Sequence, residues 1–286
     1  MGILSSLLSN PRETIVFLLL ALPGRFMALS LHEFGHAWVA DRCGDPTARL
    51  MGRLTVNPLK HIDPVGLLLM LVAGIGWAKP VPVNPINYRN YRADDLRVSL
   101  AGVTMNFTLF LLSAVVMFAF LGAALGRTPK YGSIYLAEAN RAETFVVEYQ
   151  GETCFFTEEG DSYTYIPASV LLENAAWAGD YVITPVFGQV AGYIYQMLTY
   201  FVVVNIMLAI FNLIPIPPLD GYHVLNDLVL KRPLFADQQA SMIGMGVMYA
   251  LMFTGILTKV LGAAQDFIFG NLGNLASAVY AALNII

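Results

Sequence analysis

The sequence predicts an α-helical polytopic membrane protein with a small β-rich soluble insertion. Hydrophobic residues make up 57% of the 286 residues, charged residues make up only 13%, and the mean hydropathy is +0.61. Ordinary soluble domains carry about 25% charged residues, so this balance excludes them. The net charge of −4 is small and does not indicate a nucleic-acid partner.

Long apolar runs give the order of the expected membrane segments. The runs at 14–40, 98–125 and 186–214 can each cross a hydrocarbon layer of about 30 Å. The run at 65–77 is too short to cross, which favours a re-entrant or interfacial segment. With up to two further apolar segments after residue 239, we expect four to six spans.

Residues 126–185 break the membrane pattern. Between Thr144 and Ile166, apolar, aromatic and polar residues alternate around two Gly-containing turns, which is typical of short strands. We expect either a lid or spacer or a substrate-recognition module. We therefore expect a transmembrane core in two parts, residues 1–125 and 186–286. The insertion, residues 126–185, lies between them in the sequence.

The first long run contains the motif HEFGH. His32 and His36 are four residues apart, so on a helix both imidazoles project from one face and can share one Zn²⁺. Glu33 lies beside them as a candidate base for a metal-bound water. Arg25 interrupts the same run next to Pro23, where we expect a kink; the arginine could snorkel, pair with an acid or mark the end of the span.

A carboxylate on another span can complete the site. Asp220 follows a Pro-rich turn at the end of the 186–214 run, so it is displayed on non-helical backbone. His32, His36 and Asp220 would form an open three-ligand set for one catalytic Zn²⁺ per chain. His223 is first a candidate to contact these ligands and, as a second choice, a candidate ligand itself. We interpret His61 as interfacial or structural.

Two further features suit peptide hydrolysis. Asn106 is an amide in the middle span, which can join helices or donate to a substrate backbone or oxyanion. The segment 77–85 contains three prolines, so it is expected to be an extended strand whose edge binds an unfolded substrate. The candidate substrate-binding residues there are Trp77, Lys79, Val81 and Val83. A rigid Pro-rich loop is the alternative.

The distribution of basic residues predicts the orientation. Residues 41–97 contain eight Lys and Arg, whereas residues 126–180 contain three against nine acids. By the positive-inside rule, the first segment is cytoplasmic and the insertion extracytoplasmic. HEFGH and Asp220 then both lie toward the cytoplasmic face.

Together, these motifs resemble the site-2 protease family of intramembrane zinc metalloproteases. The resemblance rests on HEFGH, AGVTMN, NLIPIPPLDG and the segment GWAKPVPVNP, in this order. It implies that His32, His36 and Asp220 bind zinc, that Glu33 is the catalytic base and that Asn106 is the family's amide on the middle span. It also implies a lipid bilayer and membrane-anchored protein substrates as partners. Val103 stands where the family usually has Pro, and the insertion at 126–185 shows no PDZ-like glycine-rich loop.

Three alternatives differ in chemistry. A zinc protease with a Glu ligand on a later helix is disfavoured. The last Glu of the chain, Glu173, lies in the insertion, so the apolar segments after it contain no Glu. A proteolytically silent membrane zinc protein that sequesters other membrane proteins would not need Glu33. A transporter component would need paired broken helices in two corresponding halves, which the sequence does not contain. The substrate and the oligomeric state are not predicted.

Overall fold

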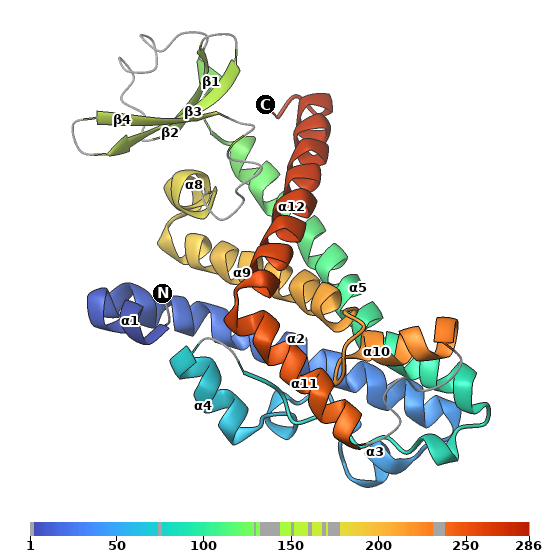
Figure 1. Cartoon of the computed structure of the whole chain (residues 1–286). Coiled ribbons are helices and arrows are strands. Elements are labelled where there is room, and N and C mark those ends of the chain that lie inside the picture. Colours follow the sequence, from blue (N-terminus) through green and yellow to red (C-terminus); the bar gives the residue numbers. More distant parts are fainter. Residues whose placement is uncertain are drawn as a thin grey trace. The chain divides into compact units, whose positions relative to one another are not determined.

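The computed structural model describes residues 3–73, 76–128, 130–131, 144–149, 152–159, 162–167, 170, 178–230 and 238–285 (Figure 1). The chain forms two compact units. The first contains Met1–Leu111 and Tyr200–Leu261, and the second contains Leu112–Thr199 and Gly262–Ile286.

The described residues are mainly helical. The α-helices are α1 (Ile3–Ser9), α2 (Pro11–Cys43), α3 (Thr47–Leu50), α4 (Pro64–Ala73), α5 (Tyr91–Leu125), α8 (Thr184–Phe187), α9 (Gln189–Asn212), α10 (Asp220–Leu225), α11 (Gln238–Phe253) and α12 (Ile256–Ala282). Short turns of tighter or wider helix are η1 (Pro58–Lys60), η2 (Pro85–Asn87), η3 (Gly179–Ile183) and η4 (Asn226–Leu230). The strands are β1 (Lys130–Tyr131), β2 (Thr144–Tyr149), β3 (Glu152–Glu159) and β4 (Ser162–Pro167).

Within the described residues, three helices are long and apolar enough to span a membrane: α2, α5 and α9. A fourth span results if α11 and α12 are counted as one broken span. The structure therefore supports an integral membrane protein but reaches only the lower end of the four to six spans expected. The α4 helix, with 10 residues, is too short to cross, in keeping with the predicted re-entrant or interfacial segment.

The α2 helix is continuous from Pro11 to Cys43, with Pro23 inside it. The expected interruption near Pro23 does not divide the helix. Farther along, α2 packs closely on α5, because a Cβ atom at Gly35 would lie only 3.0 Å from the carbonyl oxygen of Ala101. This close approach brings the HEFGH face of α2 against α5.

The segment after α4 is extended, but it is not a regular strand. Among the described residues, its one β-bridge pairs Ala78 with Ile62, and the Lys79 amide also donates to the His61 carbonyl at 2.8 Å. The prediction of an edge strand is corrected in this respect, because prolines without N–H groups interrupt the ladder. Arg53 fixes the segment by donating from Nη2 to the Lys79 carbonyl at 2.7 Å.

A buried aspartate holds the far end of this segment. Asp45 is fully buried and accepts from the Asn84 amide at 2.6 Å and from Nδ2 of Asn87 at 2.8 Å. Burial raises the pKa of Asp45, but these hydrogen bonds and those from Thr47 outweigh it and lower the pKa below its usual value. The ionised carboxylate therefore ties the Pro-rich segment to the end of α2.

The second unit contains a four-stranded sheet in the order β1-β2-β3-β4. The β2–β3 and β3–β4 pairs are antiparallel, and β1 runs parallel to β2. Cys154 and Ile166 are buried side chains of β3 and β4. The predicted soluble, extracytoplasmic character of residues 126–185 stays a prediction.

Candidate metal centre

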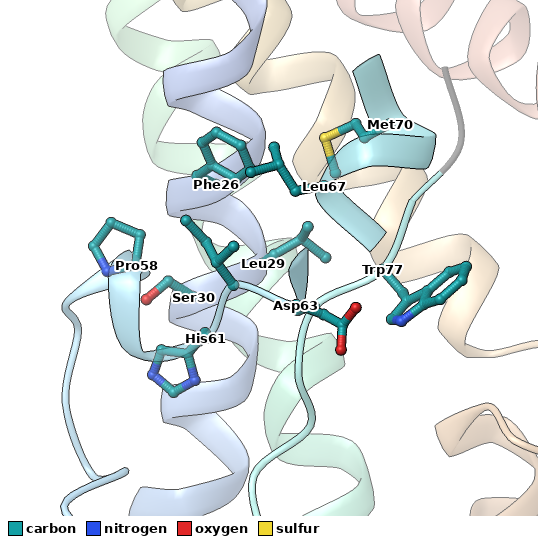
Figure 2. A pocket seen from close by; sticks show the side chains of 11 residues that line it. Phe26, Leu29, Ser30, Pro58, His61, Asp63, Leu67, Met70 and Trp77 are labelled. Carbon is teal, nitrogen blue, oxygen red and sulfur yellow. The ribbon is translucent and has the colours of Figure 1, made fainter. Parts of the chain in front are cut away.

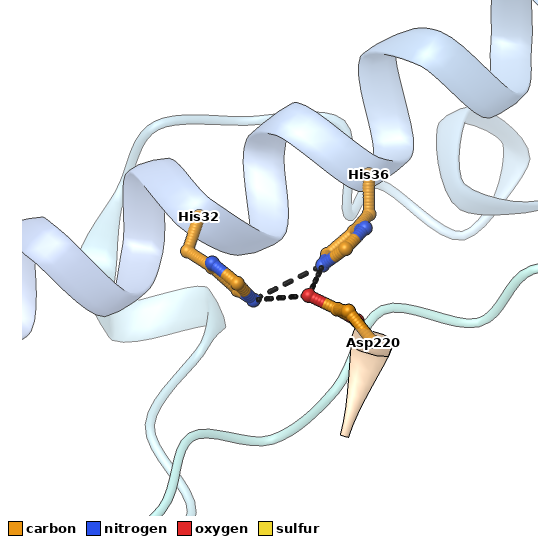
Figure 3. Close-up of side chains that lie close together, drawn as sticks. All are labelled: His32, His36 and Asp220. Atoms are coloured by element: carbon orange, nitrogen blue, oxygen red, sulfur yellow. Dashed lines mark hydrogen bonds and ion pairs between the residues drawn. The ribbon is translucent and has the colours of Figure 1, made fainter. Parts of the chain in front are cut away.

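Three potential metal ligands converge in the first unit (Figure 3). His32 and His36 project from adjacent turns of α2, and Asp220 begins α10. The two Nε2 atoms are 3.0 Å apart, and Oδ2 of Asp220 lies 3.4 Å from each of them. Tetrahedral zinc with bonds of about 2.0–2.2 Å separates its ligand atoms by about 3.3 Å. The spacing of the three atoms therefore suits one zinc ion.

The other ring nitrogens fix which atoms face the centre. Nδ1 of His36 lies 2.7 Å from the Val98 carbonyl, which can only accept, so Nδ1 carries the proton. Nδ1 of His32 lies 2.6 Å from Oδ1 of Asn106 and is likewise the donor. In the neutral rings both Nε2 atoms then present lone pairs toward each other and toward a carboxylate. Such an arrangement is repulsive unless a proton or a metal ion lies between the three atoms.

Asn106 on α5 is fully buried and uses its amide within the protein. Its Nδ2 group donates to Oδ1 of Asn205 at 2.9 Å and to the Ala28 carbonyl at 3.2 Å. With both N–H groups donated and Oδ1 facing His32, no donor remains for a substrate. The geometry therefore favours a role in orienting His32 over the predicted contact with a substrate or oxyanion.

We predict that Asn106→Ala weakens zinc binding about 10- to 100-fold, because partners of metal-bound histidines have effects of this size. The measurement is zinc affinity by competition with a chromogenic chelator. Asn212→Ala is the matched control, because Nδ2 of Asn212 donates within α9 to the Leu208 carbonyl. Equal zinc affinities in the two variants would contradict the orienting role.

The chain after α9 brings Asp220 to the centre. The Pro-rich turn ends helix α9, and Leu219 then packs with Met248 of α11 and Leu257 of α12 in a small core. Gly221 allows close passage, since a Cβ atom there would overlap the Leu213 carbonyl. Burial raises the pKa of Asp220, but when no metal is bound, hydrogen bonds and the positive charge from protonated imidazoles outweigh burial and lower that pKa. The ionised carboxylate is the form in which Asp220 can bind a metal.

Gly102 of α5 lies directly against both histidines. A Cβ atom at this position would overlap Nε2 of His36 and lie 2.7 Å from Nδ1 of His32. Gly102 is a small residue in the apolar run at 98–125, of the kind that allows close helix approach. The structure gives the reason for the small residue, because any side chain would enter the space between the rings.

Glu33 contacts the Pro-rich segment. Its half-buried carboxylate accepts a hydrogen bond through Oε2 from the Val81 amide at 2.8 Å. Val81 is buried with Ala37 and Ala48, whereas Trp77 and Val83 are exposed. The backbone of Lys79 is already bonded to His61 and Arg53. Of the four predicted substrate-binding residues, Trp77, Lys79 and Val83 are thus exposed, whereas Val81 is not.

The two remaining histidines lie outside the donor set. Nδ1 of His223 is 3.3 Å from Oδ2 of Asp95, so the structure pairs His223 with Asp95 rather than with Asp220. The hydrogen bond with Asp95 raises the pKa of His223. His61 is 2% exposed and its Nε2 lies 2.9 Å from the Thr55 carbonyl, in keeping with a structural role.

Figure 2 shows the small cavity beside His61, between α2 and the segment that contains Trp77. Its volume is about 10 Å³, which is roughly the space for one water molecule. Ser30 lines it, and the Ser30 hydroxyl donates to the Val56 carbonyl at 2.9 Å. This cavity has no room for a substrate side chain.

Comparison with known proteins places this site in a family. Residues 21–254 match the model of peptidase family M50. The chain belongs to this family. The match confirms the resemblance to the site-2 proteases, and the M50 chain is accordingly an integral membrane metalloprotease.

Its curated relatives carry similar names. YwhC of Bacillus subtilis (strain 168), named as a candidate zinc metalloprotease, is 31% identical over 261 residues, which cover 90% of each chain. Rip2 of Mycolicibacterium smegmatis, also named as a candidate zinc metalloprotease, is 36% identical over 108 residues, or 36% of this chain and 41% of the relative. Rip2 of Mycobacterium tuberculosis is 35% identical over 101 residues, covering 32% and 38%. No solved structure matches the M50 chain.

Proposed function

We propose that the M50 chain is an intramembrane zinc protease that binds one Zn²⁺ through His32, His36 and Asp220. The observation that carries this proposal is the convergence of three potential ligand atoms at separations of 3.0–3.4 Å. The names of the relatives, which specify zinc, support the choice of metal. When bound, zinc supplies a Lewis acid that polarises a peptide carbonyl and makes a coordinated water more acidic.

The side chains around the centre have separate roles in this proposal. Glu33 accepts the proton of the attacking water and delivers it to the leaving amine. The Val81 amide holds one carboxylate oxygen of Glu33, so the other oxygen is left to handle the proton. Asn106 keeps the Nε2 lone pair of His32 directed at the centre.

We further propose that the substrate is a membrane-anchored protein that lies near Trp77 and Val83. The positive-inside argument supports an active site toward the cytoplasm, with residues 126–185 on the other side of the membrane. In this position the insertion would act as a gate or lid. The silent-binder alternative has no specific observation in its favour, because a binding protein needs no Glu33 beside the metal.

The direct test is cleavage of a model transmembrane peptide by the purified full-length protein in liposomes. We expect cleavage that stops when zinc is chelated and returns when zinc is restored, with an unrelated soluble peptide left intact. Cleavage that continues in the metal-free protein would contradict the proposal, as would a zinc-loaded protein that cuts no membrane peptide from a broad panel.

A further inference from the structure

The first unit contains a second, much larger cavity of about 430 Å³. Helices α2 and α9 supply most of its lining, and Met70 of α4 and Leu257 of α12 add to it. The lining is apolar except at a few positions, of which Arg25 is the charged one. Pockets of 300–1,000 Å³ commonly bind ligands through an apolar wall and a few polar groups.

Arg25 has no acidic partner among the described residues. Its guanidinium lies over the Phe17 ring, 5.6 Å from the centroid, and makes no hydrogen bond or ion pair within this part of the chain. Phe17 itself packs edge-to-face on Tyr200, which also lines the cavity. A cation without an acidic partner, in a helix long and apolar enough to span a membrane, is more often functional than structural, which makes Arg25 a candidate to bind an acidic group.

The cavity lies on the same face of α2 as the metal centre. Arg25, Leu29, His32 and His36 follow one another at intervals of four, three and four residues, which is one stripe of an α-helix. Arg25 precedes His32 by seven residues, or about 10 Å along the helix. On the opposite wall, Phe211 of α9 lines the cavity shortly before the chain turns toward Asp220.

We propose that this cavity is a specificity subsite that binds an acidic side chain in the membrane segment of the substrate. Arg25 would pair with the Asp or Glu, and the apolar walls would hold the surrounding residues. At about 3.3 Å per extended residue, 10 Å places that acid roughly three residues from the scissile bond. The inference rests on the proposed proteolytic function.

A panel of transmembrane peptides tests the subsite. Each peptide carries one Glu at a different position, and its matched peptide carries Gln there. We expect the parent to cleave the best Glu peptide at least about tenfold faster than its Gln counterpart. Arg25→Gln should abolish that preference, and Arg25→Glu should transfer it to a peptide with Lys. Arg12→Gln is the control, because Arg12 is an exposed cation near the start of α2.

Binding provides a second measurement that does not depend on catalysis. Fluorescence transfer from labelled peptides to Glu33→Gln protein in liposomes should show the same preference for Glu, and Arg25→Gln should remove it. Arg25-dependent binding without any cleavage by the parent would contradict the protease and support the subsite. Cleavage and binding that do not depend on the charge of the peptide would overturn the subsite. So would an Arg25→Gln protein that loses bound anionic lipid but binds the peptides as the parent does.

Discussion

A Glu33→Gln variant is expected to lose cleavage by roughly 10²–10⁴-fold while it keeps its zinc. The magnitude is that of a general base, and the change replaces a proton acceptor by an amide of nearly the same shape. Glu33 is absent from the three-atom cluster of potential ligands, so its replacement should leave the metal site intact. The Gln carbonyl can still accept from the Val81 amide, which preserves the local backbone.

The measurement pairs initial cleavage rates with zinc content in the same preparations. Glu13→Gln is the control, because Glu13 is an exposed acid in the first turn of the same helix. Loss of zinc together with activity would assign Glu33 to the ligand set, and near-normal cleavage would mean that another group is the base.

A Gly102→Ala variant is expected to lose both zinc affinity and cleavage. The added methyl group would overlap Nε2 of His36 and crowd the ring of His32, so the two rings must move apart. Displacement of reacting groups by about 1 Å can cost 10²-fold in rate, and we expect a loss of at least that size. Zinc affinity should fall by at least about tenfold, since the donor atoms no longer converge.

Gly246→Ala is the matched control for this variant. Gly246 lies in α11, and a Cβ atom there would meet nothing within 4 Å. The Gly246→Ala protein should bind zinc and cleave as the parent does. Normal zinc affinity in Gly102→Ala would contradict the packing of α5 against the two histidines.

The metal-ligand cluster could be predicted because most of it is local. The spacing of His32 and His36 is set by helical periodicity alone. Asp220 is far away in sequence, but its position after a membrane run and a Pro-rich turn indicated a displayed carboxylate. These three residues are the ones that the fold brings together.

The supporting contacts could not be predicted, because they depend on long-range packing. The hydrogen bonds of Asn106 with His32 and Asn205 join three different helices. The Val98 carbonyl that orients His36 is a backbone group with no sequence signature. Arg53 was counted only as a basic residue for topology, although it fixes the backbone of the Pro-rich segment. The sequence indicated these contacts only by placing polar residues within or between apolar spans, which does not identify their partners.

In the proposed metal centre, Asp220 completes a zinc site with His32 and His36. The most direct test is the number of zinc ions per chain, measured by mass spectrometry on purified Asp220→Ala protein beside the parent and an Asp266→Ala control, in which an exposed acid of α12 is removed. We expect one zinc per chain in the parent and the control, and a large loss of zinc in Asp220→Ala. Full zinc content in Asp220→Ala would contradict the assignment of Asp220 as the third ligand and place that ligand elsewhere.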